Sequence, residues 1–163
     1  MIFVYTSNKV KAEEVIIPNS AIRLRVLPNS NAPYDQEIKK KVRDKVQQEL
    51  YVNLKDTTNI EEARTKIQQD IPNLKQIVTN VLKEENEDLD FSIDFGNHYF
   101  PEKIYKGLKY EEGDYESLLI TLGEGQGDNW WCVLFPPLCL IEAEESNGVE
   151  YKSFVKELID KYL

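Results

Sequence analysis

The sequence predicts an α+β domain in which an antiparallel sheet carries two or three helices on one face and a C-terminal helix follows. Three observations predict this fold: an alternating strand before residue 28, apolar stripes at helical spacing between 34 and 84, and further alternating strands from 89 to 122. At 163 residues one core is the default. We therefore treat residues 21–163 as a single domain and residues 1–20 as an N-terminal segment.

The first strand and the first helix follow directly from their periodicity. Ile22, Leu24 and Val26 alternate with Arg23 and Arg25, which predicts a strand with one buried face. The Pro- and Asn-rich segment 28–33 ends this strand. A stripe of apolar residues then recurs every four positions and predicts a helix of about five turns; it comprises Tyr34, Ile38, Val42, Val46 and Leu50.

A second helix is predicted to begin near residue 59. Two overlapping capping boxes are possible here, one formed by Thr58 with Glu61 and the other by Asn59 with Glu62. In a capping box the side chains satisfy free amides at the helix start. Pro72 lacks an amide donor, so it either kinks this helix or opens a third one. The apolar stripe continues to about residue 84, and the acidic run 84–88 reads as a solvated connection.

The second half of the chain predicts strands. Residues 89–95 alternate strictly, and residues 104–110 and 115–122 form a hairpin pattern around the turn at 111–114. The apolar block 130–140 is interrupted by Pro136 and Pro137, which makes it a poor central strand. After a turn at 146–148, Phe154, Leu158 and Ile159 predict a closing helix.

Composition excludes some partners. A net charge of −9 repels polyphosphate backbones and anionic membrane surfaces, so we expect no nucleic acid partner. No run approaches the roughly 18 apolar residues of a membrane helix, so we expect no direct membrane insertion. The opening segment Met1–Tyr5 is either the remnant of an export signal or a first strand, and the sequence leaves both open.

Residues with catalytic potential are few. The glycines at 123, 125 and 127 precede an aromatic block rather than a helix, so they indicate a turn with positive backbone angles, not a phosphate cradle. His98 is the only histidine, and a packed or surface role is favoured over a catalytic one. One histidine and two cysteines fall short of a zinc set. We therefore predict no catalytic residue, no cofactor and no metal.

The segment from Asp128 to Cys139 is the most distinctive. Trp130 and Trp131 are adjacent on a strand and must point to opposite faces, so both are core or one ring is left for a partner. Cys132 and Cys139 are either disulfide-bonded or two buried thiols. The predicted partner-binding residues are Glu124, Asn129, Trp130, Trp131 and Phe135.

Several of these motifs resemble those of a known family. They include the strand Ile22–Leu27 with Asn29 and Ser30, and the helical motifs 41–44 and 61–64. They continue through 115–118 and Gly123–Gly125, and most specifically through Asn129–Cys139. Across about residues 21–141 the chain resembles the stage II sporulation protein R family of endospore-forming bacteria.

The resemblance implies a protein made in the forespore and secreted into the intermembrane space of the sporangium. There it activates a membrane-embedded aspartic protease of the mother cell, which processes the sigma E precursor. This role needs binding and no chemistry, so the resemblance implies a protein that is not an enzyme. The oxidising compartment favours a disulfide between Cys132 and Cys139. Family members usually carry an amino-terminal hydrophobic export segment, and here only Met1–Tyr5 stands in its place.

Two rival functions remain in view. The chain could be a cell-wall hydrolase of the intermembrane space that uses carboxylates near His98. It could also be a non-catalytic structural protein of that space, which would bind without altering a protease.

Overall fold

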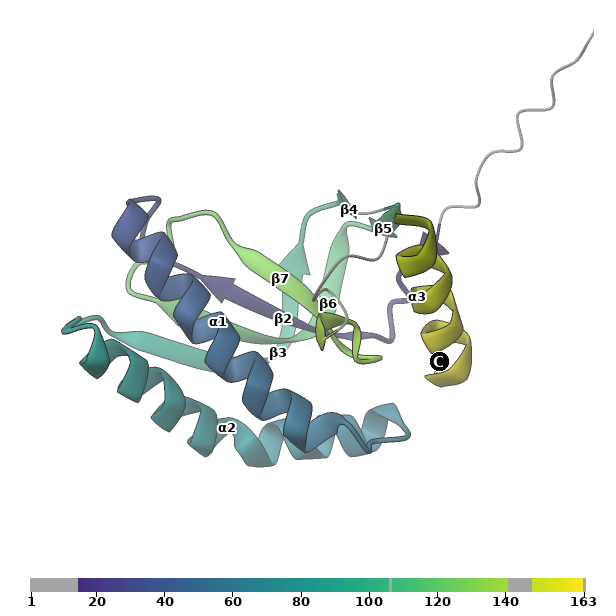
Figure 1. Cartoon of the computed structure of the whole chain (residues 1–163), viewed down its shortest axis with the longest axis horizontal. Helices are drawn as coiled ribbons and strands as arrows, with labels where there is room; N and C mark the ends of the chain where they lie inside the picture. The colour runs from purple at the N-terminus through teal and green to yellow at the C-terminus, as the bar shows by residue number, and fades with distance from the viewer. Residues whose placement is uncertain (1–14, 106, 141–147, 163) are drawn as a thin grey trace, which may run out of the picture.

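Helices and strands occur in separate blocks along the chain, as the sequence predicts for an α+β fold (Figure 1). The computed structural model describes residues 15–105, 107–140 and 148–162. In chain order its elements are β1 (Val15–Ile16), β2 (Ile22–Leu27), α1 (Pro33–Leu54), α2 (Ile60–Glu84), β3 (Phe91–Phe100), β4 (Lys103–Tyr105), β5 (Leu108–Tyr110), β6 (Gly113–Leu122), β7 (Trp130–Phe135), the 3₁₀ turn η1 (Leu138–Leu140) and α3 (Gly148–Tyr162). The predictions for Met1–Tyr5 and for residues 146 and 147 lie outside the described residues.

The main sheet has four strands in the order β3-β6-β2-β7. β3 pairs with β6 and β2 pairs with β7 in the antiparallel sense, but β2 and β6 are parallel. The sheet is therefore mixed, not antiparallel throughout. Parallel neighbours need a long crossover connection, and in this chain α1, α2, β3, β4 and β5 lie between β2 and β6.

A second sheet of three short strands has the order β1-β5-β4. β5 pairs with β4, whereas β6 pairs with β3, so the predicted hairpin between 104–110 and 115–122 is wrong. Gly107 has φ of 77°, which allows the chain to turn between Tyr105 and Leu108 and divides the expected strand in two.

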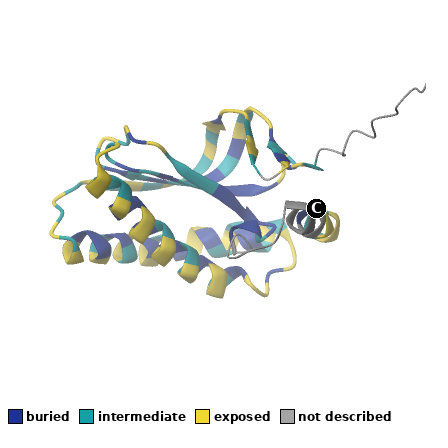
Figure 2. Ribbon diagram, turned by 45° about the horizontal axis from the view of Figure 1, so that its top comes forward, coloured by how far each residue is buried: buried dark blue, intermediate teal, exposed yellow. Residues whose placement is uncertain are grey.

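Both long helices cover one face of the main sheet, with their exposed sides turned outward (Figure 2). The predicted apolar stripe of α1 is buried from Ile38 to Leu50. Its first member, Tyr34, is 47% exposed instead. The Tyr34 hydroxyl donates to the Glu85 carbonyl at 2.5 Å. α2 begins after Asn59, whose side chain accepts from the Glu62 amide at 2.8 Å. Pro72 lies inside α2, which continues as one helix, so it does not open a third one.

The opposite side of β7 belongs to a second hydrophobic cluster. Its buried members come from the small sheet, the β1–β2 connection, β7, η1 and α3; they are Ile17, Ala21, Leu108, Tyr110, Val133, Leu138 and Val155. Cys132 and Leu134 of β7 face the helix cluster. Residues of β7 are thus packed on both faces although β7 is an edge strand.

Two acidic side chains face each other between α1 and α2. Asp70 is buried, and its Oδ2 has no hydrogen-bond partner among the described residues. Burial, and then the charge of Asp70, raise the pKa of Glu49, while the Asn73 amide donates to Glu49 Oε1 at 2.7 Å and opposes the rise. Because the folded state binds this proton more tightly than the unfolded chain, stability falls as pH rises from the ordinary glutamate pKa through the raised value.

We expect Glu49→Gln to raise the melting temperature at pH 7 by about 2 to 4 °C, because an amide can donate to Asp70 and carries no charge. The loss of stability as pH rises above the ordinary glutamate pKa should shrink in this variant. Circular dichroism melts across that pH range measure both effects. Glu37→Gln on the exposed face of α1 is the matched control. An equal gain in both variants would mean that net charge, and not the Glu49–Asp70 contact, limits stability.

Candidate functional site

Two loops dock against each other at one end of the main sheet. We call residues 28–32 and 123–129 the loop pair. Gly123 and Gly125 have φ of 55° and 64°, as predicted for this turn, whereas Gly127 does not have a positive φ. The second loop joins β6 to β7 and leads into no helix, so its amides do not form the helix-start cradle of a phosphate site.

Asparagine side chains hold the loop pair together. Asn29 Oδ1 accepts from the Glu124 amide at 2.9 Å, and Asn31 Oδ1 accepts from the Asp128 amide at 2.7 Å. A Cβ at Gly123 would lie 2.2 Å from Asn29 Oδ1, so only glycine lets the loops approach this closely. The loops are therefore fixed in one arrangement, which lowers the entropy lost when a partner binds.

The first two turns of α1 anchor the loop pair to the helix layer. Asp35 Oδ2 accepts from the Ser30 hydroxyl at 2.6 Å and from the Asn29 amide at 3.1 Å. The Lys39 ammonium donates to the Asp128 carbonyl at 3.0 Å and is buried. Burial lowers the pKa of Lys39, and the Asp128 carboxylate partly opposes that change.

Trp130 and Trp131 point to opposite faces of β7. Trp130 packs against the helix cluster, with the Arg43 guanidinium 5.5 Å from its ring centroid. Trp131 packs against the second cluster, 5.1 Å from the ring of Phe100 and 5.6 Å from that of Tyr110. Both tryptophans are half-buried, so each ring combines a packed side with an accessible one.

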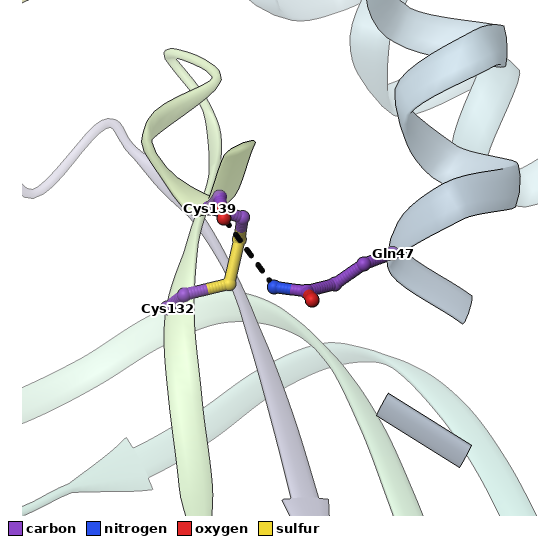
Figure 3. The surroundings of a disulfide bond; sticks show 3 residues. All are labelled: Gln47, Cys132 and Cys139. Atoms are coloured by element: carbon purple, nitrogen blue, oxygen red, sulfur yellow. Dashed lines mark hydrogen bonds between the residues drawn. A yellow bond between two sulfur atoms is a disulfide. The ribbon is translucent and has the colours of Figure 1, made fainter. Parts of the chain in front are cut away.

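A disulfide joins Cys132 of β7 to Cys139 of η1, with their Cα atoms 5.4 Å apart (Figure 3). β7 ends at Phe135, directly before the two prolines, and the chain turns back. Gln47 of α1 donates to the Cys139 carbonyl at 3.4 Å, which ties the turn to the helix layer. A closed loop of this size stabilises a fold by about 2.5 kcal/mol in the chain-entropy model.

The remaining predicted docking residues differ in accessibility. Glu124 is exposed on the loop pair. The Asn129 amide oxygen faces the guanidinium of Arg25, 2.5 Å from Nη2 and 3.1 Å from Nε, in the orientation that satisfies both groups. Phe135 is buried, and its ring packs edge-on against Tyr162 at 5.4 Å. Phe135 therefore supports this surface from inside the core.

Arg23 is the residue that sequence reasoning missed. Alternation predicts a solvated side chain, yet Arg23 is 0% exposed, and its three guanidinium nitrogens have no hydrogen-bond partner among the described residues. Four aromatic rings surround it within 5.6 Å, with Tyr115 nearest at 3.6 Å; the others are Phe100, Tyr110 and Trp131. Burial lowers the pKa of Arg23, while Tyr115 and Tyr110 oppose that change. We call Arg23 and these rings the arginine box.

His98 lies inside β3 rather than beyond the strand. Its Nε2 is 2.7 Å from Asp94 Oδ2, and its Nδ1 is 2.6 Å from Ser117 Oγ, so an acid, a histidine and a serine do form a chain. However, Ser117 is 0% exposed, and its hydroxyl also donates to the Tyr115 carbonyl at 3.1 Å. A nucleophile must reach its substrate, so this arrangement supports a structural role.

Within ranges 15–105, 107–140 and 148–162, no three histidine, cysteine, aspartate or glutamate side chains gather as a metal site would require. None of the helices in those ranges is both long and apolar enough to cross a bilayer.

Comparisons with known proteins agree with the motifs. A family model described as "Stage II sporulation protein R" matches residues 18–145. Stage II sporulation protein R of Bacillus subtilis (strain 168) is 45% identical over 156 residues, which covers 96% of this chain and 67% of the relative. No solved structure matches the chain at a significant level.

The arginine box generates a stability prediction. Burying an unpaired ion costs several kcal/mol, and four ring contacts of about 1 kcal/mol each offset most of that cost. We expect Arg23→Met, which keeps the unbranched length, to change the free energy of unfolding by less than about 1 kcal/mol. Arg23→Ala should lower it by about 3 kcal/mol because it leaves a cavity among the rings. Urea unfolding measures both variants. Equal losses would show that the positive charge itself is required.

Proposed function

We propose that this chain, which belongs to the stage II sporulation protein R family, is a signal that the forespore secretes to activate a membrane-embedded aspartic protease of the mother cell. Family membership gives the chain a role in sporulation. In our proposal the activated protease processes the sigma E precursor, and the chain acts in the intermembrane space by binding, not by catalysis.

The observation that carries the proposal is the rigid loop pair beside the half-buried Trp130. Exposed Glu124, Gln126 and Asp128 project from loops whose backbone is already fixed by Asn29 and Asn31. A ligand activates a receptor by binding its active state more tightly than its inactive state. A preorganised surface supplies that binding energy with little ordering cost.

Within this surface we assign different tasks to the predicted docking residues. Glu124 and the accessible side of Trp130 contact the protease. Asn129 is engaged with Arg25, and Trp131 belongs to the arginine box, so these two position the loop and β7. Phe135 supports β7 from the core.

The disulfide supports the proposed compartment. Stable disulfides form on the oxidising side of a membrane and are rare in the bacterial cytosol. Cys132 and Cys139 are both buried, so the bond is shielded from small reductants. A secreted domain of this size gains stability from such a bond.

The function is tested with vesicles that contain the protease and its precursor substrate. We expect the oxidised domain to trigger precursor cleavage in a saturable manner. Trp130→Ala should raise the half-maximal concentration at least about 30-fold, the effect of losing an interface residue worth about 2 kcal/mol. Its melting temperature should fall less than that of Trp131→Ala, which removes one wall of the arginine box.

Two controls separate this proposal from its rivals. His98→Gln should retain signalling. If the protein were a hydrolase that depends on His98, the same variant would lose its activity. A structural protein of the intermembrane space would bind the vesicles and leave the precursor uncut. Absence of processing at saturating oxidised domain would contradict the proposed function.

A further inference from the structure

β3 is an edge strand of unusual length. It pairs with β6 through ten consecutive residue pairs, from Phe91–Leu122 to Phe100–Gly113, and no described strand pairs with its other side. Ten residues in a strand span about 34 Å. One side of the main sheet therefore ends in a long line of backbone groups.

The register identifies the backbone groups that face away from β6. The Gly123 amide donates to the Asp90 carbonyl at 2.7 Å, in line with the β3–β6 pairing. Hydrogen-bonded pairs alternate in an antiparallel ladder, so Ser92, Asp94 and Gly96 bond to β6. The N–H and C=O groups of the odd-numbered residues between 91 and 99 point outward. Among these, the Tyr99 carbonyl accepts from Arg25 at 3.0 Å, which leaves the open stretch at 91–97.

β3 itself carries few of the features that usually protect an edge against strand pairing. Proteins cover or interrupt free edges with proline, lysine, bulges or short strands. β3 contains no proline and no lysine, and its register with β6 runs without a shift. The edge is thus suited to receive another strand.

The side chains along the edge define the chemistry of that strand. Phe91, Ile93 and Phe95 lie half-buried on the helix side of the sheet. Ser92 and Asp94 are on the other side, where the Asp94 side chain is 71% exposed. Because residues in a paired strand share a face with their neighbours, an added strand needs apolar and polar residues in alternation.

Charge determines which polar residues fit. Exposed Asp88 and Asp90 precede the strand, and exposed Glu112 and Asp114 lie at its far end beside Tyr99. β3 itself carries no lysine or arginine. A second copy of β3 would therefore bring acidic groups together, whereas a basic strand would complement them.

We propose that the outer edge of β3 binds an extended segment of a partner protein by strand addition, and that this segment alternates apolar and basic residues. The Gly123–Asp90 hydrogen bond joins the edge to the loop pair, so one partner can contact both. The strand addition itself follows from the edge geometry and holds whether or not the partner is a protease.

A synthetic peptide tests the proposal directly. The probe is N-acetylated and C-amidated Val-Lys-Val-Lys-Val-Lys-Val with a fluorescent label, added to the oxidised domain and followed by anisotropy. Binding should shift the amide resonances of Phe91, Ile93, Phe95 and Asn97. A peptide with glutamate in place of lysine should bind at least about tenfold more weakly because it loses charge complementarity. A lysine peptide N-methylated at alternate amides should also bind at least about tenfold more weakly because it loses ladder hydrogen bonds.

The matched variants are Asn97→Pro and Asn97→Ala. Asn97 is exposed and its N–H points outward, so proline removes an edge donor while β3 keeps its bonds to β6. We expect Asn97→Pro to weaken the peptide at least about fivefold, the value of one lost hydrogen bond, and Asn97→Ala to stay within about twofold.

Three results would overturn the proposal: no binding at millimolar peptide, equal binding of the N-methylated peptide, or a dimer that buries this edge in sedimentation experiments. The N-methylated peptide uses the unmodified domain, so it decides the question even if Asn97→Pro unfolds. The peptide experiment does not measure precursor processing. A failure of strand addition is therefore distinct from a failure of the proposed signalling function.

Discussion

The buried guanidinium of Arg23 lies where the two sheets meet. β2 is a central strand, and one of its faces packs under α1 and α2 while the other directs Arg23 into a box of aromatic rings. The rings come from β3, β5, β6 and β7, so both sheets meet at one side chain. Among the described residues these rings are the close neighbours of the guanidinium, and their electron-rich faces offset part of the cost of burying its charge. Trp131 is held in this enclosure while β7 pairs along β2.

Both ends of β7 are held in place by neighbouring segments. At one end it emerges from the loop pair, which asparagine side chains and close glycine contacts hold in place. At the other end the disulfide and the Gln47 contact fix the turn after Phe135. The polar groups of these regions are used to hold backbone in position, and Ser117 is sealed beneath His98. Such an arrangement presents a shaped surface and is suited to binding.

Local signals in the sequence predicted the elements, and long-range packing determined the rest. The helical stripes, the Asn59 cap and the end of β7 at the prolines are all encoded within a few residues. The parallel pairing of β2 with β6 joins residues about ninety positions apart, and no local pattern reports it. Arg23 was predicted to be solvated because alternation cannot show that both faces of β2 are covered. Of the predicted docking residues, Phe135 is in the core, where it belongs to the helix-side cluster and its ring contacts Tyr162 of α3.

In our proposal the preorganised surface around the loop pair binds the partner. Amide hydrogen exchange of the oxidised domain with protease-containing vesicles, compared with empty vesicles, tests it most directly. We expect slower exchange in residues 123–130 when the protease is present, with unchanged exchange along the outer faces of α1 and α2. Slowing confined to those helix faces, or none at saturating protease, would contradict it.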